Sequence, residues 1–234
     1  MRHRFSFAKT LGYSESANEE VEAELDVFEA METCRAVRFF KKDPVPDELV
    51  DKILYAATRA PSPGNSQGWD FIVVTDRAIK EKLSEKITEV IDATVESIQK
   101  SMGGLDALDD VNRRMLQGTQ NMARTMGDIP VIILVCGKKV YPPQAPTEQF
   151  VWSALYPAAQ NITVAARALG LGTCFTTYQN TCEKELRELL DIPSDVYIAA
   201  FIPVGWPAIN FGPLARRPVS DFVHRNGWQG DLRG

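Results

Sequence analysis

Two pairs of arginines flank a polar turn in this chain. Arg35 and Arg38 lie near its start, Arg216 and Arg217 lie near its end, and the turn covers residues 60–69. Guanidinium groups bind phosphate oxygens through paired hydrogen bonds, and exposed backbone amides bind anions and ring heteroatoms. A phosphate monoester joined to a flat heterocycle needs both kinds of group. The pattern therefore predicts a site for flavin mononucleotide (FMN).

Each motif also has an ordinary explanation. Arginines usually extend into solvent, a basic pair in a proline-containing tail is usually solvated, and a Pro/Gly/Asn turn can simply join a helix to a strand. Two observations favour the site. Phe39 and Phe40 follow Arg38 and would hold the arginines against a packed wall. The turn is longer than such a joint requires, and donors and acceptors are concentrated at Ser62, Asn65, Ser66 and Gln67.

Two threonines form a further candidate. Thr176 and Thr177 lie where an apolar segment is expected to end as a strand, which is a common place for ligand-facing residues. The alternative is that they only reflect the preference of threonine for strands, and the residues leave both explanations open. The chain has no Gly-x-Gly-x-x-Gly after a strand and no Gly-Lys-Ser/Thr loop. A nicotinamide cofactor is therefore expected to visit the site rather than reside in it.

Composition limits the class of protein. The 234 residues are 44% apolar and carry a net charge of -5, which predicts one domain and argues against a nucleic-acid partner. The apolar runs are strand-length, so no membrane span is expected, and the basic N-terminus lacks the apolar run of a secretory signal. The four cysteines show no Cys-x-x-Cys spacing, and three of them lie in or beside apolar segments, as reduced core cysteines do, which predicts a reducing cytoplasm.

The two histidines, His3 and His224, lie near the ends of the chain. Their position argues against a Ser/His/Asp hydrolase and against a His-rich metal site, so no metal is predicted. The chemistry is therefore assigned to a bound cofactor.

Helices and strands that would position these residues alternate along the chain. Apolar residues recur at helical spacing in 15–32, after Asp47, after Asp76 and in 151–169, where Gly170 supplies the stop. Both aspartates are expected to cap their helices. Apolar runs predict strands at 71–74, 131–136, 172–177 and 197–204, and helical order is expected to fail over 101–110 and resume over 111–126. The alternation predicts a layered α+β or α/β domain without fixing strand order or direction.

Four segments together carry a family resemblance. Residues 60–74 are similar to Ala-Pro-Ser-x-x-Asn-x-Gln-Pro-Trp-x-Phe-x-Val-Val, residues 35–38 to Arg-Arg-Ser-x-Arg, residues 168–177 to Ala-x-Gly-Leu-Gly, and residues 204–207 to Val-Gly-Tyr-Pro. Over residues 28–219 the chain thus resembles the FMN-dependent nitroreductase family. The resemblance implies an α+β fold, a nitroreductase-like α/β sandwich whose central mixed sheet is flanked by helices. It also implies an intertwined homodimer with FMN at the subunit interface.

The resemblance implies roles for individual residues. Arg38 would approach the pyrimidine edge of the flavin and act electrostatically in catalysis, with no side-chain acid or base assigned. Arg35 and Arg216 would bind the phosphate end, and the backbone of Phe175 to Thr177 would flank the ring near N5. Ser62 to Asn65 would cross from the partner subunit. The complete set expected to bind the cofactor is Arg35, Ala36, Arg38, Ser62, Pro63, Gly64, Asn65, Gln67, Phe175, Thr176, Thr177, Arg216 and Arg217.

The chain departs from the family pattern at three positions. Cys34 stands at the family's first arginine, Ala36 at its serine, and Gly68 at the proline that follows Gln67. One cationic group is thereby lost. The phosphate contact is then expected to shift to Arg217 or to backbone amides.

The resemblance also implies a single nitroreductase-like domain over 1–234 and a reaction. Residues 1–20 would form an N-terminal extension, 80–126 a mobile cap, and 208–234 a tail that contacts the partner subunit. NAD(P)H would give hydride to FMN, and a small-molecule acceptor such as a nitroaromatic or quinone would be reduced in a ping-pong mechanism.

Other activities remain open. They are reductive dehalogenation, flavin fragmentation of the kind that makes the lower ligand of cobalamin, storage of FMN without turnover, and a purely structural role. Against dehalogenation, a lid containing tyrosine is expected, and no aromatic residue occurs between Phe71 and Tyr141.

Overall fold

The computed structural model describes residues 25–102 and 107–228. Helices and strands alternate along these residues, as the sequence predicts. The longer elements are α2 (Val27–Thr33), α3 (Asp47–Ala57), β1 (Trp69–Val74), α4 (Arg77–Met102), α5 (Asp110–Arg124), β2 (Val131–Gly137), α6 (Glu148–Ala168), β3 (Gly172–Thr173), α7 (Glu183–Leu190) and β4 (Tyr197–Gly205). Short 3-10 turns lie at Pro63–Asn65, Met126–Asp128, Tyr178–Asn180 and Val219–Asp221. The expected N-terminal extension, 1–20, lies outside the described residues.

The strands form one sheet in the order β1-β2-β4-β3. All three of its ladders are antiparallel. The resemblance implies a mixed sheet, but among the described residues the single parallel pairing is an isolated bridge between Ala36 and Thr173. Residues 35–38 thus lie along the β3 edge without extending the sheet by a full strand.

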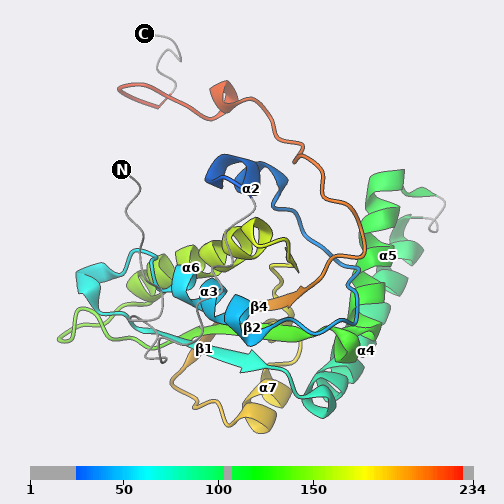
Figure 1. The fold of residues 1–234 in the computed structure, drawn as a ribbon, viewed down its shortest axis with the longest axis horizontal. Coiled ribbons are helices and arrows are strands. Elements are labelled where there is room, and N and C mark those ends of the chain that lie inside the picture. The colour runs from blue at the N-terminus through cyan, green and yellow to red at the C-terminus, as the bar shows by residue number, and fades with distance from the viewer. Residues whose placement is uncertain (1–24, 103–106, 229–234) are drawn as a thin grey trace.

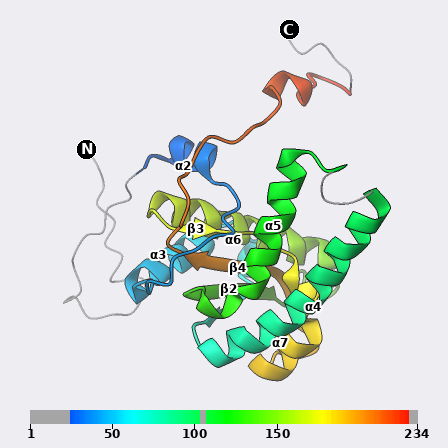
Figure 2. The same ribbon diagram turned by 90° about the vertical axis from the view of Figure 1, so that its right-hand side faces the viewer.

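Helices cover both faces of the sheet, which makes an α+β sandwich (Figures 1 and 2). Every residue of β2 is buried, as expected for a strand covered on both sides. Because side chains alternate along a strand, Ile133 packs in the core with α3 and α6, whereas Ile132 and Leu134 pack in the core with α4 and α7. The sheet is therefore a rigid platform between two apolar layers.

Local sequence signals explain most of the helix ends. The Asp76 carboxylate accepts a hydrogen bond from the Ile79 amide at 3.1 Å, as predicted for a cap of α4. Gly170, with φ of 78°, ends α6 in the left-handed conformation that favours glycine. The prediction for Asp47 is wrong, because Pro46 occupies the N-cap and Asp47 is the first helical residue of α3. Proline tolerates this position because its fixed φ is compatible with a helix start.

The predicted cap region forms a helical hairpin. Helix α4 extends to Met102 and α5 begins at Asp110, so the predicted break over 101–110 is confirmed for residues 107–109 and is too wide at both edges, where residues 101, 102 and 110 are helical. The Asp109 carboxylate caps α5 by accepting from the amides of Val111 and Asn112. The two helices lie side by side in Figure 2. Mobility of residues 80–126 stays a prediction.

The chain after β4 runs along α2 and then leaves the body of the molecule (Figure 1). The Leu214 amide donates to the Glu32 carbonyl at 2.9 Å, and the Arg167 guanidinium lies over the Phe211 ring at 3.7 Å. Further along, Trp228 is 86% exposed. Contact of this tail with a partner subunit stays a prediction. Within 25–102 and 107–228, no helix has the length and hydropathy needed to span a membrane.

Candidate functional site

Arg38 lies half-buried where three parts of the fold meet. The preceding residue, Val37, is fully buried and donates its amide to the Thr173 carbonyl at 2.8 Å, which fixes the segment on the sheet edge. On the other side, Asn121 of α5 donates from Nδ2 to the Arg38 carbonyl at 3.1 Å. Gly118 of α5 faces the aliphatic stem of Arg38. Contacts from distant elements thus determine where this arginine stands.

The guanidinium of Arg38 lies close to two buried groups. Burial raises the pKa of the Cys174 thiol to about 11, and the positive charge of Arg38 opposes this shift. Burial also raises the pKa of the Tyr178 hydroxyl, again against the charge of Arg38. Both groups therefore stay protonated near neutral pH. In the described part of the chain no carboxylate pairs with Arg38, so no ion pair there neutralises its charge.

The backbone after β3 presents amides on the same edge. The amides of Cys174 and Thr176 donate to carbonyls of β4 at 3.2 and 3.1 Å. Because amide directions alternate in an extended segment, those of Phe175 and Thr177 point away from β4, toward the edge on which Val37 binds Thr173. Among the described hydrogen bonds neither of these two amides has a partner. The edge thus combines a cation with free donors.

The side chain of Thr176 is not part of this edge. Its hydroxyl donates to the Phe201 carbonyl at 2.7 Å, which turns it toward β4. The predicted strand 172–177 is shorter than expected, because only Gly172–Thr173 forms a ladder and Thr176 makes an isolated bridge with Phe201. If residues 175–177 contact a ligand, they do so through their backbone.

The other arginines lie farther along the surface. Arg35 is exposed, and its Nη1 lies 3.8 Å from where a Cβ on Gly212 would stand, so the tail passes beside it. Arg216 is also exposed and donates to the carbonyl of Ala215 at 3.0 Å. The guanidinium of Arg217 lies 4.2 Å from the centre of the Phe222 ring. The structure therefore brings Arg35 close to the tail, and the binding roles of Arg35, Arg216 and Arg217 stay predictions.

The turn at 62–67 folds on itself. The Ser62 hydroxyl accepts a hydrogen bond from the Gln67 amide at 2.7 Å and lies 3.3 Å from the hydroxyl of Ser66. Gly64, Asn65 and Gln67 have positive φ angles of 59°, 49° and 48°. Left-handed backbone at three of four consecutive positions makes this turn tight, and the side chains of Asn65 and Gln67 are exposed on it.

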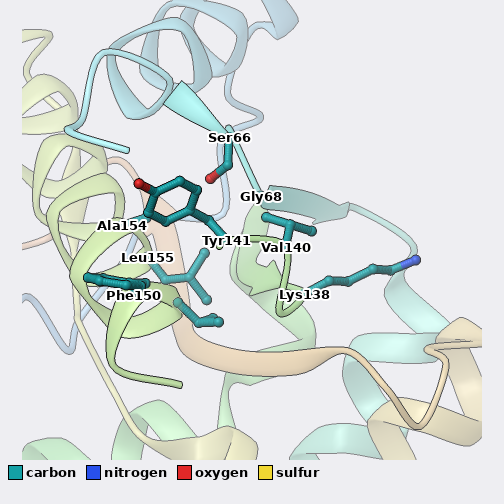
Figure 3. A pocket seen from close by; sticks show the side chains of 9 residues that line it. Ser66, Gly68, Lys138, Val140, Tyr141, Phe150, Ala154 and Leu155 are labelled. Atoms are coloured by element: carbon teal, nitrogen blue, oxygen red, sulfur yellow. The ribbon is translucent and has the colours of Figure 1, made fainter. Parts of the chain in front are cut away.

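Tyr141 buttresses this turn, a contact that sequence reasoning did not find. Its ring packs directly on Gly64, so closely that a Cβ there would overlap it. Figure 3 shows Tyr141 beside Ser66 and Phe150, in a depression that Gly68, Lys138, Val140, Val151, Ala154 and Leu155 also line. The free volume of about 10 Å³ has room for roughly one water molecule. This depression therefore supports the turn and is too small for a flavin.

The turn and Arg38 lie at opposite ends of the sheet. Trp69, just after the turn, pairs with Gly137 of β2, whereas Thr173, beside residues 35–38, pairs with Val204, whose β2 partner is Val131. Six residues of strand separate these two levels, which corresponds to roughly 20 Å. Figure 1 shows the same separation along the direction of β1. Within one chain, the two predicted groups of site residues therefore lie apart.

The residues at the Arg38 end fit part of an FMN molecule. They offer an unneutralised, half-buried cation and two free amides on one edge, and Gly172 allows Val37 to approach the strand because a Cβ there would lie 2.9 Å from Val37 Cγ2. Among the described residues no cluster of His, Cys, Asp and Glu could hold a metal ion. The arrangement suits an anionic ligand.

The chain is thus an α+β sandwich with a cation and free amides at the β3 edge of its sheet, and its sequence identifies the family. Residues 32–206 match the model of the nitroreductase family, and the chain belongs to this family.

Individual relatives span several activities. A protein from Methanothermobacter thermautotrophicus named "Putative NADH dehydrogenase/NAD(P)H nitroreductase" is 31% identical over 81% of this chain and 82% of its own length. An iodotyrosine deiodinase of Danio rerio is 27% identical over 81% of this chain and 63% of its own. A 5,6-dimethylbenzimidazole synthase of Rhodospirillum rubrum is 28% identical over 83% and 85%. Family membership alone therefore does not select one reaction.

A solved structure shares the fold. A "putative nitroreductase in complex with fmn" from Desulfovibrio desulfuricans superimposes with a TM-score of 0.63 at 25% identity. The match covers 88% of this chain and 99% of the other.

Proposed function

We propose that this protein is an FMN-dependent oxidoreductase that takes hydride from NAD(P)H and reduces a nitroaromatic, quinone or similar acceptor by a ping-pong mechanism. The observation that carries the proposal is the charge of Arg38, which no carboxylate in the described residues neutralises. Two further findings support it. A structural neighbour contains FMN, and a relative is named for NAD(P)H.

The residues at the Arg38 edge then have distinct roles. Bound FMN supplies the ability to accept and release hydride. Arg38 stabilises the negative charge that reduction places at the pyrimidine edge. The backbone of residues 175–177 holds the ring near N5, and Arg35 and Arg216 hold the phosphate, with Arg217 as the reserve cation. No side-chain acid or base is needed, which agrees with the protonated state of Cys174 and Tyr178.

The complete site is proposed to form between two copies of the chain. The roughly 20 Å between the turn and Arg38 supports this arrangement, because the two partial sites of one chain lie too far apart to share a ring. The partner subunit would supply Ser62, Pro63, Gly64, Asn65 and Gln67. Exposed apolar side chains in the tail, such as Val219 and Trp228 at 75% and 86% exposure, support a tail that packs on the partner.

Complementation between inactive chains tests this arrangement. One chain carries Arg38→Ala, and the other carries Ser62→Ala with Asn65→Ala. If the turn is supplied in trans, each mixed dimer has one intact site and binds one FMN tightly, whereas each parent dimer binds weakly. Mixed dimers that recover no tight site would place turn and arginine in the same chain. Light scattering of wild type checks that the species is a dimer.

The reaction itself is tested by colour. Purified protein should be yellow, NAD(P)H should bleach it under anaerobic conditions, and a nitroarene or quinone should restore the colour. Bleaching without recolouring would indicate an FMN store, and a colourless protein that takes up no FMN would refute the proposal. Iodotyrosine as acceptor, and loss of flavin in air, test the activities named for the other relatives. We assign acceptor choice to the predicted cap region, residues 80–126.

The cysteines support a reducing compartment, and we place the protein in the cytoplasm. All four are free. Burial raises the pKa of Cys136 and of Cys182 to about 12, so neither is a reactive thiol at neutral pH.

A further inference from the structure

Helix α5 contains a buried glycine in its interior. Gly118 lies at the ninth of fifteen residues of this helix. Glycine in a helix interior is less favourable than alanine, because it has more backbone freedom to lose. Glycine at this position therefore makes the helix less stable than alanine would. The atoms around the missing Cβ show what a methyl group there would contact.

The nearest neighbour of that missing atom is Arg38. A Cβ on Gly118 would lie 3.1 Å from Arg38 Cδ, 3.5 Å from Arg38 Cβ and 3.5 Å from Phe39 Cε2. Carbon atoms pack best at about 3.5–4.0 Å, so the contact with Cδ is too close and the other two are ordinary. A methyl group at this position would push the stem of Arg38 by a few tenths of an ångström.

The next turn of the same helix holds the backbone of Arg38. Asn121 is three residues beyond Gly118 and so lies on the same face of α5. Its Nδ2 donates to the Arg38 carbonyl at 3.1 Å. One face of α5 thus contacts both the main chain and the side chain of this arginine.

The opposite side of Arg38 is also fixed. The Val37 amide binds the Thr173 carbonyl, so the segment cannot move away from α5 without breaking that bond. The Tyr178 hydroxyl, near the Arg38 guanidinium, lies 3.4 Å from the Thr119 carbonyl of α5. Since the backbone is held on both sides, added volume at residue 118 must displace the side chain.

We propose that Gly118 and Asn121 are positioning residues for Arg38, with Gly118 setting how far the guanidinium reaches along the ligand edge. The proposal rests on the proposed function, because it gives Arg38 a ligand only if the chain binds FMN. It assigns to α5 a task beyond covering the sheet. A displacement of α5 would then also displace the Arg38 guanidinium.

The first test compares FMN affinity with stability of the FMN-free protein. Gly118→Ala should raise the Kd for FMN about three- to tenfold, because a site must be held to within about 0.5 Å. Its FMN-free Tm should stay within about 4 °C of wild type, since the gain in helix propensity offsets crowding. Gly118→Val should weaken binding further. The control Gln117→Ala, at an exposed neighbouring position, should change the Kd less than twofold.

A double-mutant cycle asks whether the effect passes through Arg38. In an Arg38→Ala background the close contact with Cδ is gone, so Gly118→Ala should raise the FMN-free Tm by about 2–4 °C and leave the FMN Kd unchanged. If Arg38→Ala binds FMN too weakly to titrate, the Tm values of the four FMN-free proteins show whether the two positions are coupled. Asn121→Ala should raise the Kd about threefold in the wild-type background only.

The outcomes separate this inference from the proposed function. Wild-type protein that binds no FMN would refute the proposed function. Wild type that binds, with Arg38→Ala weakened and Gly118→Ala unchanged, would overturn the positioning role alone. The same holds if Gly118→Ala weakens binding equally with and without the Arg38 side chain, or if the two substitutions have additive effects on Tm.

Discussion

The two ends of the sheet are built in different ways. At one end Arg38 is held by contacts from β3 and α5. Among the described residues its guanidinium has no carboxylate partner, and the neighbouring amides of Phe175 and Thr177 have no hydrogen-bond partner. At the other end the turn at 62–67 is held by its own hydrogen bonds and by one aromatic ring. Tertiary contacts thus position the first region, whereas hydrogen bonds within the turn shape most of the second. Changes at Arg38 should act mainly on ligand binding, whereas changes that disturb the backbone of the turn should also lower stability.

The largest effect is expected for Arg38→Ala. A charge-assisted hydrogen bond contributes about 1.5–3 kcal/mol, so the Kd for FMN should rise about 10- to 100-fold, or hydride transfer from NAD(P)H should slow by a similar factor. Titration of the FMN-free protein and stopped-flow reduction measure the two. Arg38→Lys should lose less, because it keeps the charge without the planar fork. Unchanged values of both quantities would remove the assigned role.

The next effect should appear in the turn. Gly64→Val places a branched side chain at φ of 59°, against the Tyr141 ring, and should lower the free energy of unfolding by about 2–3 kcal/mol. Urea denaturation measures this change. Gly227→Val is the matched control, because a Cβ there meets nothing within 4 Å. Equal stability of the two variants would mean that the turn is looser than described.

A smaller effect is expected for the tail arginines. Arg216→Ala should chiefly lower FMN occupancy, by about fivefold, because only one exposed cation is removed. Arg217→Ala should have less effect, because that guanidinium already stacks on Phe222 at 4.2 Å. FMN content after dialysis measures both. The reverse order would assign the phosphate contact to Arg217.

The smallest effect concerns the thiol next to Arg38. Its pKa of about 11 means that Cys174 carries almost no thiolate at pH 8, and reactivity should rise only as the pH approaches that value. A thiol reagent at pH 8 should therefore label Cys34, the only cysteine that is not buried, and all four after unfolding. Cys34→Ser should abolish the native signal. Rapid labelling of Cys174 in the folded protein would show that this thiol, next to Arg38, is exposed to solvent.

Sequence reasoning succeeded where a signal is local. The periodicity of 151–169 and Gly170 predicted α6 and its end, and the apolar run at 131–136 predicted β2. It failed at Asp47, where a cap signal was outweighed by Pro46, and it overestimated the strand at 172–177. For the candidate site, motif matching singled out Arg38 and residues 175–177, whose binding roles stay predictions, whereas Tyr141, Gly118 and Asn121 carried no recognisable motif.

The sequence by itself determined the family, the alternation of helices and strands, and the residue types that suit a phosphate and a ring. Only the tertiary structure decided that the sheet ladders are antiparallel, that the turn and Arg38 stand at opposite ends, and that α5 holds Arg38. The physical reason is range. A helix face or a cap is encoded within about four residues, but Asn121 and Arg38 are 83 residues apart and meet only after the sheet and its covering helices have packed.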